Sequence, residues 1–421
     1  MIKQPFYATI KIQKIKKVVD GCFMNKLYNN FDEVASDMSN YFKNCIPFIS
    51  KNHLKFLPYI VLGMVDSESV VTSDISSSIN SDLFSNNTDT IQKRVWRFLN
   101  NPNVNVSKYF KYIIKKVVFD ISNVRHNELV VTLDHMFTKN NFVTLMFTLK
   151  IDNQGIPIWF STERTLSNCH CEIQKKARKK IFREDFIFNA LDEVIDLLSP
   201  LNTKITFLAD RWFFNLKLLK HIESKGHYYC FRAKENSNVK FLFYDKKEKH
   251  EIYSYLSTLR STKHHSKYYS VELGDLKLKC NISVSCTIKN EEEPWYIVSN
   301  IEPNKAIKKY SKRFGSIEMF FKSQKTNGFY LESTKTKNLH AFENLYGILC
   351  IASLWLNIIA VDYIKNHNHV KNKINIRYNK KNSSGKLTRI LSTFKLGLKL
   401  FSKIFKSNIN YKLKCSFKLY L

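Results

Sequence analysis

The hydrophobic pattern changes its period near residue 128, and this change restricts the fold more than any other feature of the chain. Three β-rich runs come first, "ELVVTLDHMF", "FVTLMFTLKID" and "IPIWFSTER", separated by the turn signals "TKNN" and "NQG". A helix, a buried strand "KITFLAD", a second helix and a strand "HYYCFRAK" follow. Three meandering strands followed by alternating helices and strands predict an α/β layer with a mixed sheet.

The segment before this pattern is helical. Residues 31–120 show helical periodicity, and the run "TIQKRVWRFLNNPNV" places its apolar residues on one helix face. Lys93, Arg94 and Arg97 lie on the opposite face. Short helices that end in a basic one are typical of a small DNA-binding domain, so we predict DNA contacts from these three side chains. The alternative is an ordinary basic surface on a helical subdomain.

The segment after the pattern returns to β character from about residue 236 to 301, and helical character resumes from Asn304 to Ile364. We predict an all-β insertion between two parts of the α/β core. The run "LYGILCIASLWLNIIAVDYI" has the length of a membrane span, but Asn357 and Asp362 interrupt it, so we predict a buried core helix. The predicted division is a helical DNA-binding domain (1–120), the first part of the catalytic core (121–235), a β-rich insertion (236–301), the second part of the core (302–366) and a basic C-terminal region (367–421).

The charge balance indicates the kind of partner. The chain has 67 Lys and Arg residues against 36 acids, a net charge of +31, which favours nucleic acid or an anionic membrane. No acid follows Asp362, and "RILSTFKLGLKLFSKIF" has the pattern of a basic amphipathic helix that suits DNA, a protein partner or a membrane. Nine cysteines without a CxxC pair, and an N-terminus without an apolar signal segment, predict an intracellular protein.

Three acidic residues occupy positions that suit metal-dependent phosphodiester cleavage. Asp134 directly follows the apolar run "LVVTL", and Asp210 directly follows "ITFLA". Glu318 is the only acid in "YSKRFGSIEMFFKSQK". Metal-dependent phosphodiester cleavage needs two or three carboxylates that converge on Mg²⁺, and acids at the ends of neighbouring strands meet at one edge of a sheet. Taken singly, each acid also reads as a turn former, a cap or a surface ion pair.

Around these acids the chain resembles bacterial insertion-sequence DDE transposases, in the group with the signature Tyr-x2-Arg-x3-Glu-x6-Lys. The resemblance runs from "RVWRFLNN" to the helix ending near Ile364 and includes "FLADRWFF", "CFRAKEN" and "GFYLESTKTKN". It implies a ribonuclease-H-like mixed-sheet core interrupted by the β insertion. It also implies a metal-binding catalytic triad of Asp134, Asp210 and Glu318, with Tyr310, Arg313 and Lys325 gripping phosphate.

The chain departs from this family pattern at three places. Four residues separate Arg313 from Glu318, one more than in the signature, which on a regular helix puts the two side chains about 140° apart. A kink or bulge at Gly315 and Ser316 would restore their alignment. Trp212 stands where the family often has a small residue, and His135 and Met136 replace a usual threonine. These changes keep the triad but would also fit a decayed, weakly active copy.

The resemblance implies a cut-and-paste transposase that uses Mg²⁺, for which Mn²⁺ can substitute. Its partners would be double-stranded DNA, as transposon ends and target, with no membrane and with a homodimer on paired ends, in the cytoplasm and associated with the bacterial nucleoid. Trp295 would stack on a base flipped out of the transposon end, or else pack in the core of the insertion. The alternatives are a repressor derived from an inactive transposase and a ribonuclease-H-like DNA nuclease.

Overall fold

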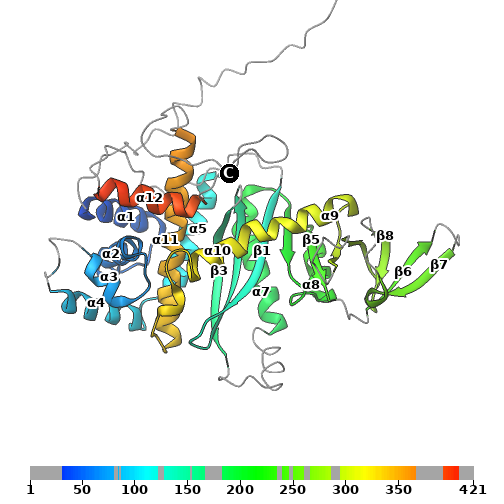
Figure 1. Ribbon diagram of the computed structural model, residues 1–421, viewed down its shortest axis with the longest axis horizontal. Helices are drawn as coiled ribbons and strands as arrows, with labels where there is room; N and C mark the ends of the chain where they lie inside the picture. The colour runs from blue at the N-terminus through cyan, green and yellow to red at the C-terminus, as the bar shows by residue number, and fades with distance from the viewer. Residues whose placement is uncertain are drawn as a thin grey trace, which may run out of the picture.

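A computed structural model describes residues 31–79, 84, 87–121, 128–151, 154–165, 183–234, 239–245, 250–259, 266–285, 294–366 and 392–406. These residues form an elongated molecule with helices at one end and β-strands in the centre and at the other end (Figure 1). The helices are α1 (Phe31–Cys45), α2 (Lys51–Ser67), α3 (Thr72–Ser78), α4 (Thr88–Asn100), α5 (Val106–Ile121), α7 (Glu184–Leu198), α8 (Leu216–Ser224), α9 (Pro303–Tyr310), α10 (Met319–Lys325), α11 (Leu339–Asn366) and α12 (Thr393–Lys406).

The strands of the described residues form one ten-stranded sheet in the order β3-β2-β1-β4-β5-β10-β9-β8-β6-β7. β1 pairs in parallel with β4, and β4 with β5, while the other pairs are antiparallel. The fold is therefore mixed α/β with a large mixed sheet, as predicted, and is consistent with a ribonuclease-H-like transposase domain. The strands are β1 (Leu129–Phe137), β2 (Phe142–Ile151), β3 (Gln154–Arg164), β4 (Ile205–Ala209), β5 (Tyr228–Ala233), β6 (Lys240–Asp245), β7 (His250–Tyr255), β8 (Ser266–Leu273), β9 (Leu278–Val284) and β10 (Tyr296–Ser299).

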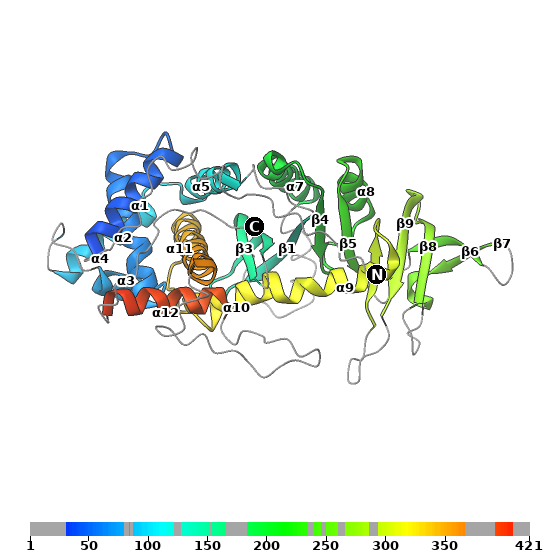
Figure 2. The ribbon, with the colours of Figure 1, turned by 90° about the horizontal axis from the view of Figure 1, so that it is seen from above.

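Helices cover both faces of the central strands. α5, α7 and α8 lie on one face, and α9 and α10 run along the other (Figure 2). Because β4 is buried along its whole length, it is a continuous apolar run, as expected for a strand covered on both faces.

The segment predicted as an all-β insertion consists of strands β6 to β10 and one short 3₁₀ turn in its described part. Its last strand, β10, pairs with β5 of the core, with Val298 opposite Phe231. β9 then pairs with β10, and β8 with β9, so the segment continues the core sheet outward. These strands therefore place residues at the end of β10 directly beside the core.

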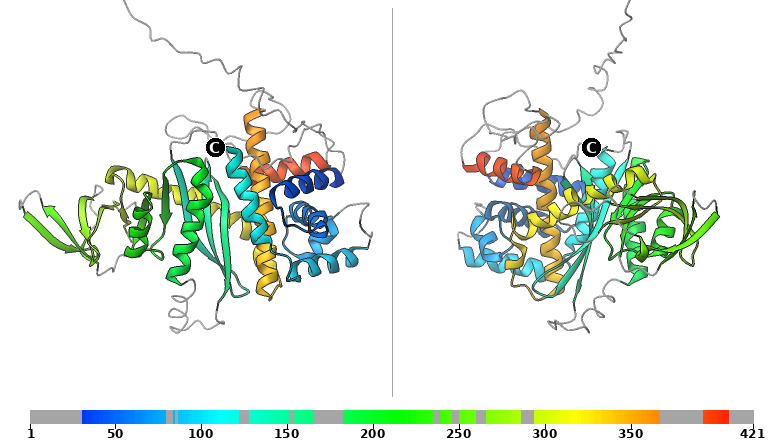
Figure 3. Two further views of the ribbon diagram at one scale, coloured as in Figure 1. Left: turned by 180° about the vertical axis from the view of Figure 1, so that it is seen from behind. Right: turned by 45° about the vertical axis from the view of Figure 1, so that its right-hand side comes forward.

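Helix α11 is the central helix of the helical end. The stretch Leu339–Ile364 is long and apolar enough to cross a membrane, yet 94% of its most apolar window is buried inside the protein. The predicted buried core helix is thus confirmed. α11 lies between the N-terminal helices and the sheet (Figure 3). The buried Asn344 side chain accepts a hydrogen bond from the Val106 amide and donates to the Leu99 and Val104 carbonyls, which ties α4 and α5 to α11.

The predicted basic amphipathic helix near the C-terminus is present as α12, and its apolar side packs on α11. Phe394, Leu400 and Phe401 are buried, and a Cβ at Gly397 would lie 2.2 Å from the Leu356 carbonyl oxygen. Only glycine permits so close an approach of the two helices. The apolar face of α12 is therefore part of the core.

Candidate active site

The sheet brings the first two acids together. Thr132 of β1 is in register with Leu208 of β4, so Asp134 and Asp210, each two residues further on, lie side by side. Asp210 directly follows β4 as predicted, but β1 continues to Phe137 and Asp134 pairs with Met146 of β2, so the prediction that Asp134 ends its strand is wrong. The sequence predicted a mixed sheet, and the parallel pairing of β1 with β4 makes these two strands neighbours. Asp134 is buried. Asp210 begins a tight turn, in which its carboxylate accepts a hydrogen bond from the Trp212 amide at 2.9 Å and its carbonyl accepts one from the Phe213 amide at 3.1 Å.

Glu318 reaches the same place from a helix that contains a π-turn. α9 continues through a 3₁₀ turn (Ser311–Arg313) and a π-helical turn (Phe314–Glu318) into α10. A π-turn bonds residue i to i+5 and accommodates one residue more than an α-turn, so a five-residue step returns to the same face. The extra residue between Arg313 and Glu318 is absorbed there. The bulge expected at Gly315 and Ser316 is thus confirmed.

The π-turn is held by the sheet beneath it. The Ser316 hydroxyl lies 3.2 Å from the Thr148 hydroxyl in a buried contact. A Cβ at Gly155 of β3 would lie 2.9 Å from the Ser316 carbonyl carbon and oxygen, closer than real Cβ atoms come. Glycine at 155 therefore lets the irregular turn sit directly on the sheet.

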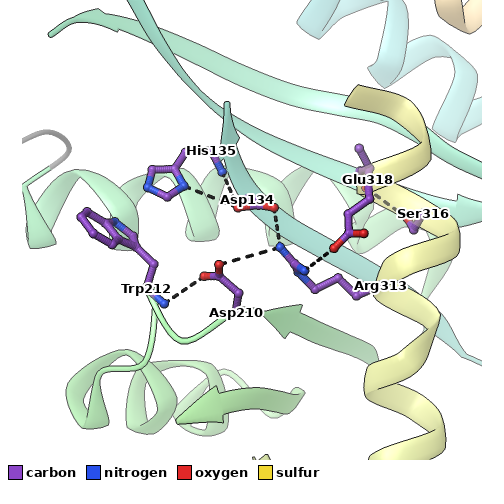
Figure 4. Close-up of polar contacts among 8 residues, drawn as sticks. Asp134, His135, Asp210, Trp212, Arg313, Ser316 and Glu318 are labelled. Atoms are coloured by element: carbon purple, nitrogen blue, oxygen red, sulfur yellow. Dashed lines mark hydrogen bonds and ion pairs between the residues drawn. The ribbon is translucent and has the colours of Figure 1, made fainter. Parts of the chain in front are cut away.

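The guanidinium of Arg313 lies among the three carboxylates (Figure 4). It donates to Asp134 Oδ2 at 2.5 Å and to Glu318 Oε1 at 2.7 Å, and it lies 3.9 Å from Asp210 Oδ2. Its side chain is only 8% exposed, and its Nε is buried without a hydrogen-bond partner among the described residues. Arg313 was predicted to grip phosphate, whereas here it joins the acids to one another.

Burial dominates the local electrostatics, and neighbouring like charges add to its effect. Burial raises the pKa of Asp210, and the neighbouring Asp134 carboxylate raises it further, against the opposing charge of Arg313. Burial also raises the pKa of Glu318, again against Arg313. Burial would lower the pKa of Arg313, but the charges of Asp134, Tyr310, Asp210 and Glu318 outweigh it and raise that pKa. The cluster thus holds more negative charge than one guanidinium neutralises.

The donor set suits a hard divalent cation, because carboxylate oxygens are the ligands that Mg²⁺ prefers. In the described part of the chain, however, no group of three or more His, Cys, Asp or Glu side chains is close enough to hold a metal ion as it stands. The guanidinium of Arg313 accounts for this, since it takes the space between the acids. Asp134, Asp210 and Glu318 therefore fit a shared cation, provided that Arg313 withdraws.

One family model matches part of the chain. Residues 188–355 match the family model of the transposase DDE domain. The match supports a DDE-type transposase. It spans Asp210 and Glu318, while Asp134 lies before it. No curated protein matches the chain.

The other residues predicted to contact phosphate or a flipped base are packed around the Glu318 helix. Tyr310 is buried, which raises its pKa to about 12, and Lys325 donates to the Phe137 carbonyl at 2.5 Å and pairs with Glu332 at 3.0 Å. Trp295, just before β10, stacks on Phe314 with ring centroids 5.3 Å apart. Trp295 also packs on a small apolar cluster that includes Ile297 of its own β segment and Tyr310 of α9, so both the base-stacking role and the packing role stay predictions.

The basic side chains predicted on α4 lie on the surface. Lys93, Arg94 and Arg97 are all exposed, but the Arg94 guanidinium lies over the rings of Phe84 and Phe56, 4.7 and 5.3 Å from their centroids. Arg94 therefore has a packing role besides any contact with DNA.

Sequence reasoning missed a contact between two residues that depart from the family pattern. The His135 ring lies 5.1 Å from the Trp212 ring and 5.3 Å from Phe213, and its Nδ1 is 3.4 Å from Asp134 Oδ1. The two unusual residues thus pack against each other beside the acids. Their joint occurrence close to Asp134 and Asp210 in the sequence was the available signal.

Proposed function

We propose that this protein is a cut-and-paste DNA transposase whose active centre is Asp134, Asp210 and Glu318. One observation carries the proposal: three acids from β1, the turn after β4 and the π-turn point at a single cation, the Arg313 guanidinium. Three carboxylates are assembled at a desolvation cost, which indicates a purpose other than stability.

Each acid has a distinct support for this role. Asp134 lies within β1, where it is paired with β2, Asp210 directly follows the neighbouring strand β4, and Glu318 is fixed by the π-turn above β3. When bound there, Mg²⁺, or Mn²⁺ in its place, lowers the pKa of the attacking water and stabilises the leaving oxygen. Arg313, released from the acids, is then free to pair with a phosphate of the substrate.

The proposed substrate is double-stranded DNA at the ends of the element, followed by target DNA. Nicking frees a 3′-OH, which attacks the opposite strand or the target. The net charge of +31 and the exposed Lys93 and Arg97 on α4 support backbone contacts. Tyr310 and Lys325 would brace the Glu318 helix on the phosphate side, and the Trp295–Phe314 pair would stack a flipped base. We propose a homodimer on paired ends, in the cytoplasm with the bacterial nucleoid.

The test uses DNA that flanks the gene, including its inverted repeats. Asp134→Ala, Asp210→Ala and Glu318→Ala are each expected to abolish Mg²⁺-dependent nicking while end binding, measured without metal, stays within a few-fold of wild type. Wild-type protein that binds these ends without nicking them would indicate a repressor. Nicking without strand transfer would indicate a nuclease. Near wild-type nicking by any one variant would remove that residue from the centre.

A further inference from the structure

We infer that Trp212 is a second base-stacking platform, which holds the nucleotide of the flanking DNA next to the scissile phosphate. This inference rests on the proposed function and adds a subsite to it. Trp212 lies two residues after Asp210, and 42% of its surface is exposed although it is among the largest apolar side chains.

The turn after β4 fixes the position of Trp212. Its backbone amide donates to Asp210 Oδ1 at 2.9 Å, and the Phe213 amide closes the same turn on the Asp210 carbonyl. As a result Phe213 points inward and is buried, while Trp212 points outward beside the acids. This turn fixes the backbone of Trp212 relative to Asp210.

The His135 ring supports the indole from one side. It lies 5.1 Å from the Trp212 ring with 40° between the planes. His135 is itself packed against Phe137 at 5.0 Å and Phe213 at 5.3 Å. A ring held in this way loses little freedom when a base stacks on its exposed part, so the binding energy is retained.

The two aromatic platforms lie on different sides of the acids. Figure 4 shows Trp212 and His135 on one side of Asp134 and Asp210, and Arg313 with Glu318 on the other. The Trp295–Phe314 pair lies against helix α9, because Trp295 also packs on Tyr310 of α9 with ring centroids 5.4 Å apart, and α9 runs along the face of the sheet opposite α8 (Figure 2). A scissile phosphate at the acids joins the element end to the flanking DNA. If Trp295 takes the element end, the Trp212 platform faces the flanking nucleotide.

A paired base within a duplex offers no free face, so the Trp212 platform gains its contact only when the flanking nucleotide is unpaired or terminal. Nicking creates such a nucleotide. The Trp212 platform is therefore selective for cleaved over intact DNA.

The test uses the inverted-repeat duplex with 2-aminopurine as the first flanking nucleotide, either intact or already nicked. Wild-type protein should quench the fluorescence of the nicked duplex. Trp212→Ala should lose this quenching and bind the nicked duplex about tenfold to a hundredfold more weakly, the range expected for one stacked base. Its affinity for the intact duplex should stay unchanged, and Trp212→Phe should keep part of the quenching.

Phe48→Ala is the matched control, since Phe48 is also 42% exposed and packs on Tyr109 and Tyr112 of α5, at the helical end of the molecule. Phe48→Ala should quench the fluorescence and bind both duplexes as the wild-type protein does. If the wild-type protein binds and nicks the ends, equal quenching by wild type and Trp212→Ala would overturn this inference alone. Wild-type protein that neither binds nor nicks ends would overturn the proposed function, and the inference with it.

Discussion

Arg313→Met is expected to destabilise the metal-free protein and to strengthen its binding of Mg²⁺. The substitution removes the guanidinium and keeps a side chain of similar reach. Arg313 and Asp134 are 8% and 11% exposed as side chains, so losing this pair leaves an uncompensated buried carboxylate, at a cost of about 3–5 kcal/mol. The Glu318 side chain is 42% exposed, so its pair adds only about 0–1 kcal/mol.

Mg²⁺ should reverse much of this loss. In wild type, a metal ion shared by the acids must first displace the guanidinium, whereas in the variant the acids are free to bind it. Each tenfold gain in affinity adds about 1.4 kcal/mol of stabilisation at saturating metal. Urea denaturation with and without Mg²⁺ measures both quantities.

Lys309→Met is the control for this experiment, because it breaks another partly buried ion pair, with Glu128. It should lose stability without any change in the effect of Mg²⁺. The reasoning is refuted if metal-free Arg313→Met is as stable as wild type, or if Mg²⁺ stabilises both by the same amount.

Three further predictions concern residues around the acids. The raised pKa of Asp210 means that its contribution to stability is present below its unfolded pKa and is lost as pH rises through its folded pKa. Asp210→Asn should therefore make the metal-free protein more stable at neutral pH. If the pH dependence of the free energy of unfolding, measured by urea denaturation, is the same in this variant as in wild type, the prediction is wrong. Trp295→Ala should leave the rate of first-strand nicking unchanged but slow the attack of the 3′-OH on the opposite strand by roughly tenfold to a hundredfold. An abasic site at the position of the flipped base should rescue this second step. If the rates of both steps and the melting temperature fall together, Trp295 has a packing role instead. Gly155→Ala should push the π-turn off β3 and slow nicking by up to about a hundredfold, as small misplacements of catalytic groups do. Gly347→Ala creates a similar clash, with Val106, and should lower stability alone. Equal nicking rates in the two variants would contradict the idea that Gly155 lets β3 support the π-turn.

The positions of Asp134 and Asp210 were predictable because local pattern determines them. Each follows a run of buried strand residues, and the parallel register of β1 and β4 brings the two positions together, although β1 itself continues to Phe137. The π-turn was predictable for a different reason. A helix that must present Arg313 and Glu318 on one face, with one residue too many between them, has few ways to do so.

The orientation of Arg313 was not predictable, because it depends on a pairing with Asp134 across 179 positions of sequence. Periodicity places a side chain on a helix face but does not say which charge it meets there. The same limit applies to β10, whose pairing with β5 joins the β segment to the core sheet. It also applies to His135 of β1 and Trp212 of the turn after β4, which meet only in the folded protein.

The most direct test of a metal centre at Asp134, Asp210 and Glu318 replaces Mg²⁺ with Fe²⁺ in the complex with end DNA. In the presence of ascorbate and peroxide, a bound Fe²⁺ generates hydroxyl radicals that cut the protein backbone nearest to the ion. Cuts should map next to these three residues, should fade as Mg²⁺ competes and should vanish in Asp210→Asn. Cuts at other places, or cuts that persist unchanged in Asp210→Asn, would contradict the assignment of these acids as the metal-binding centre.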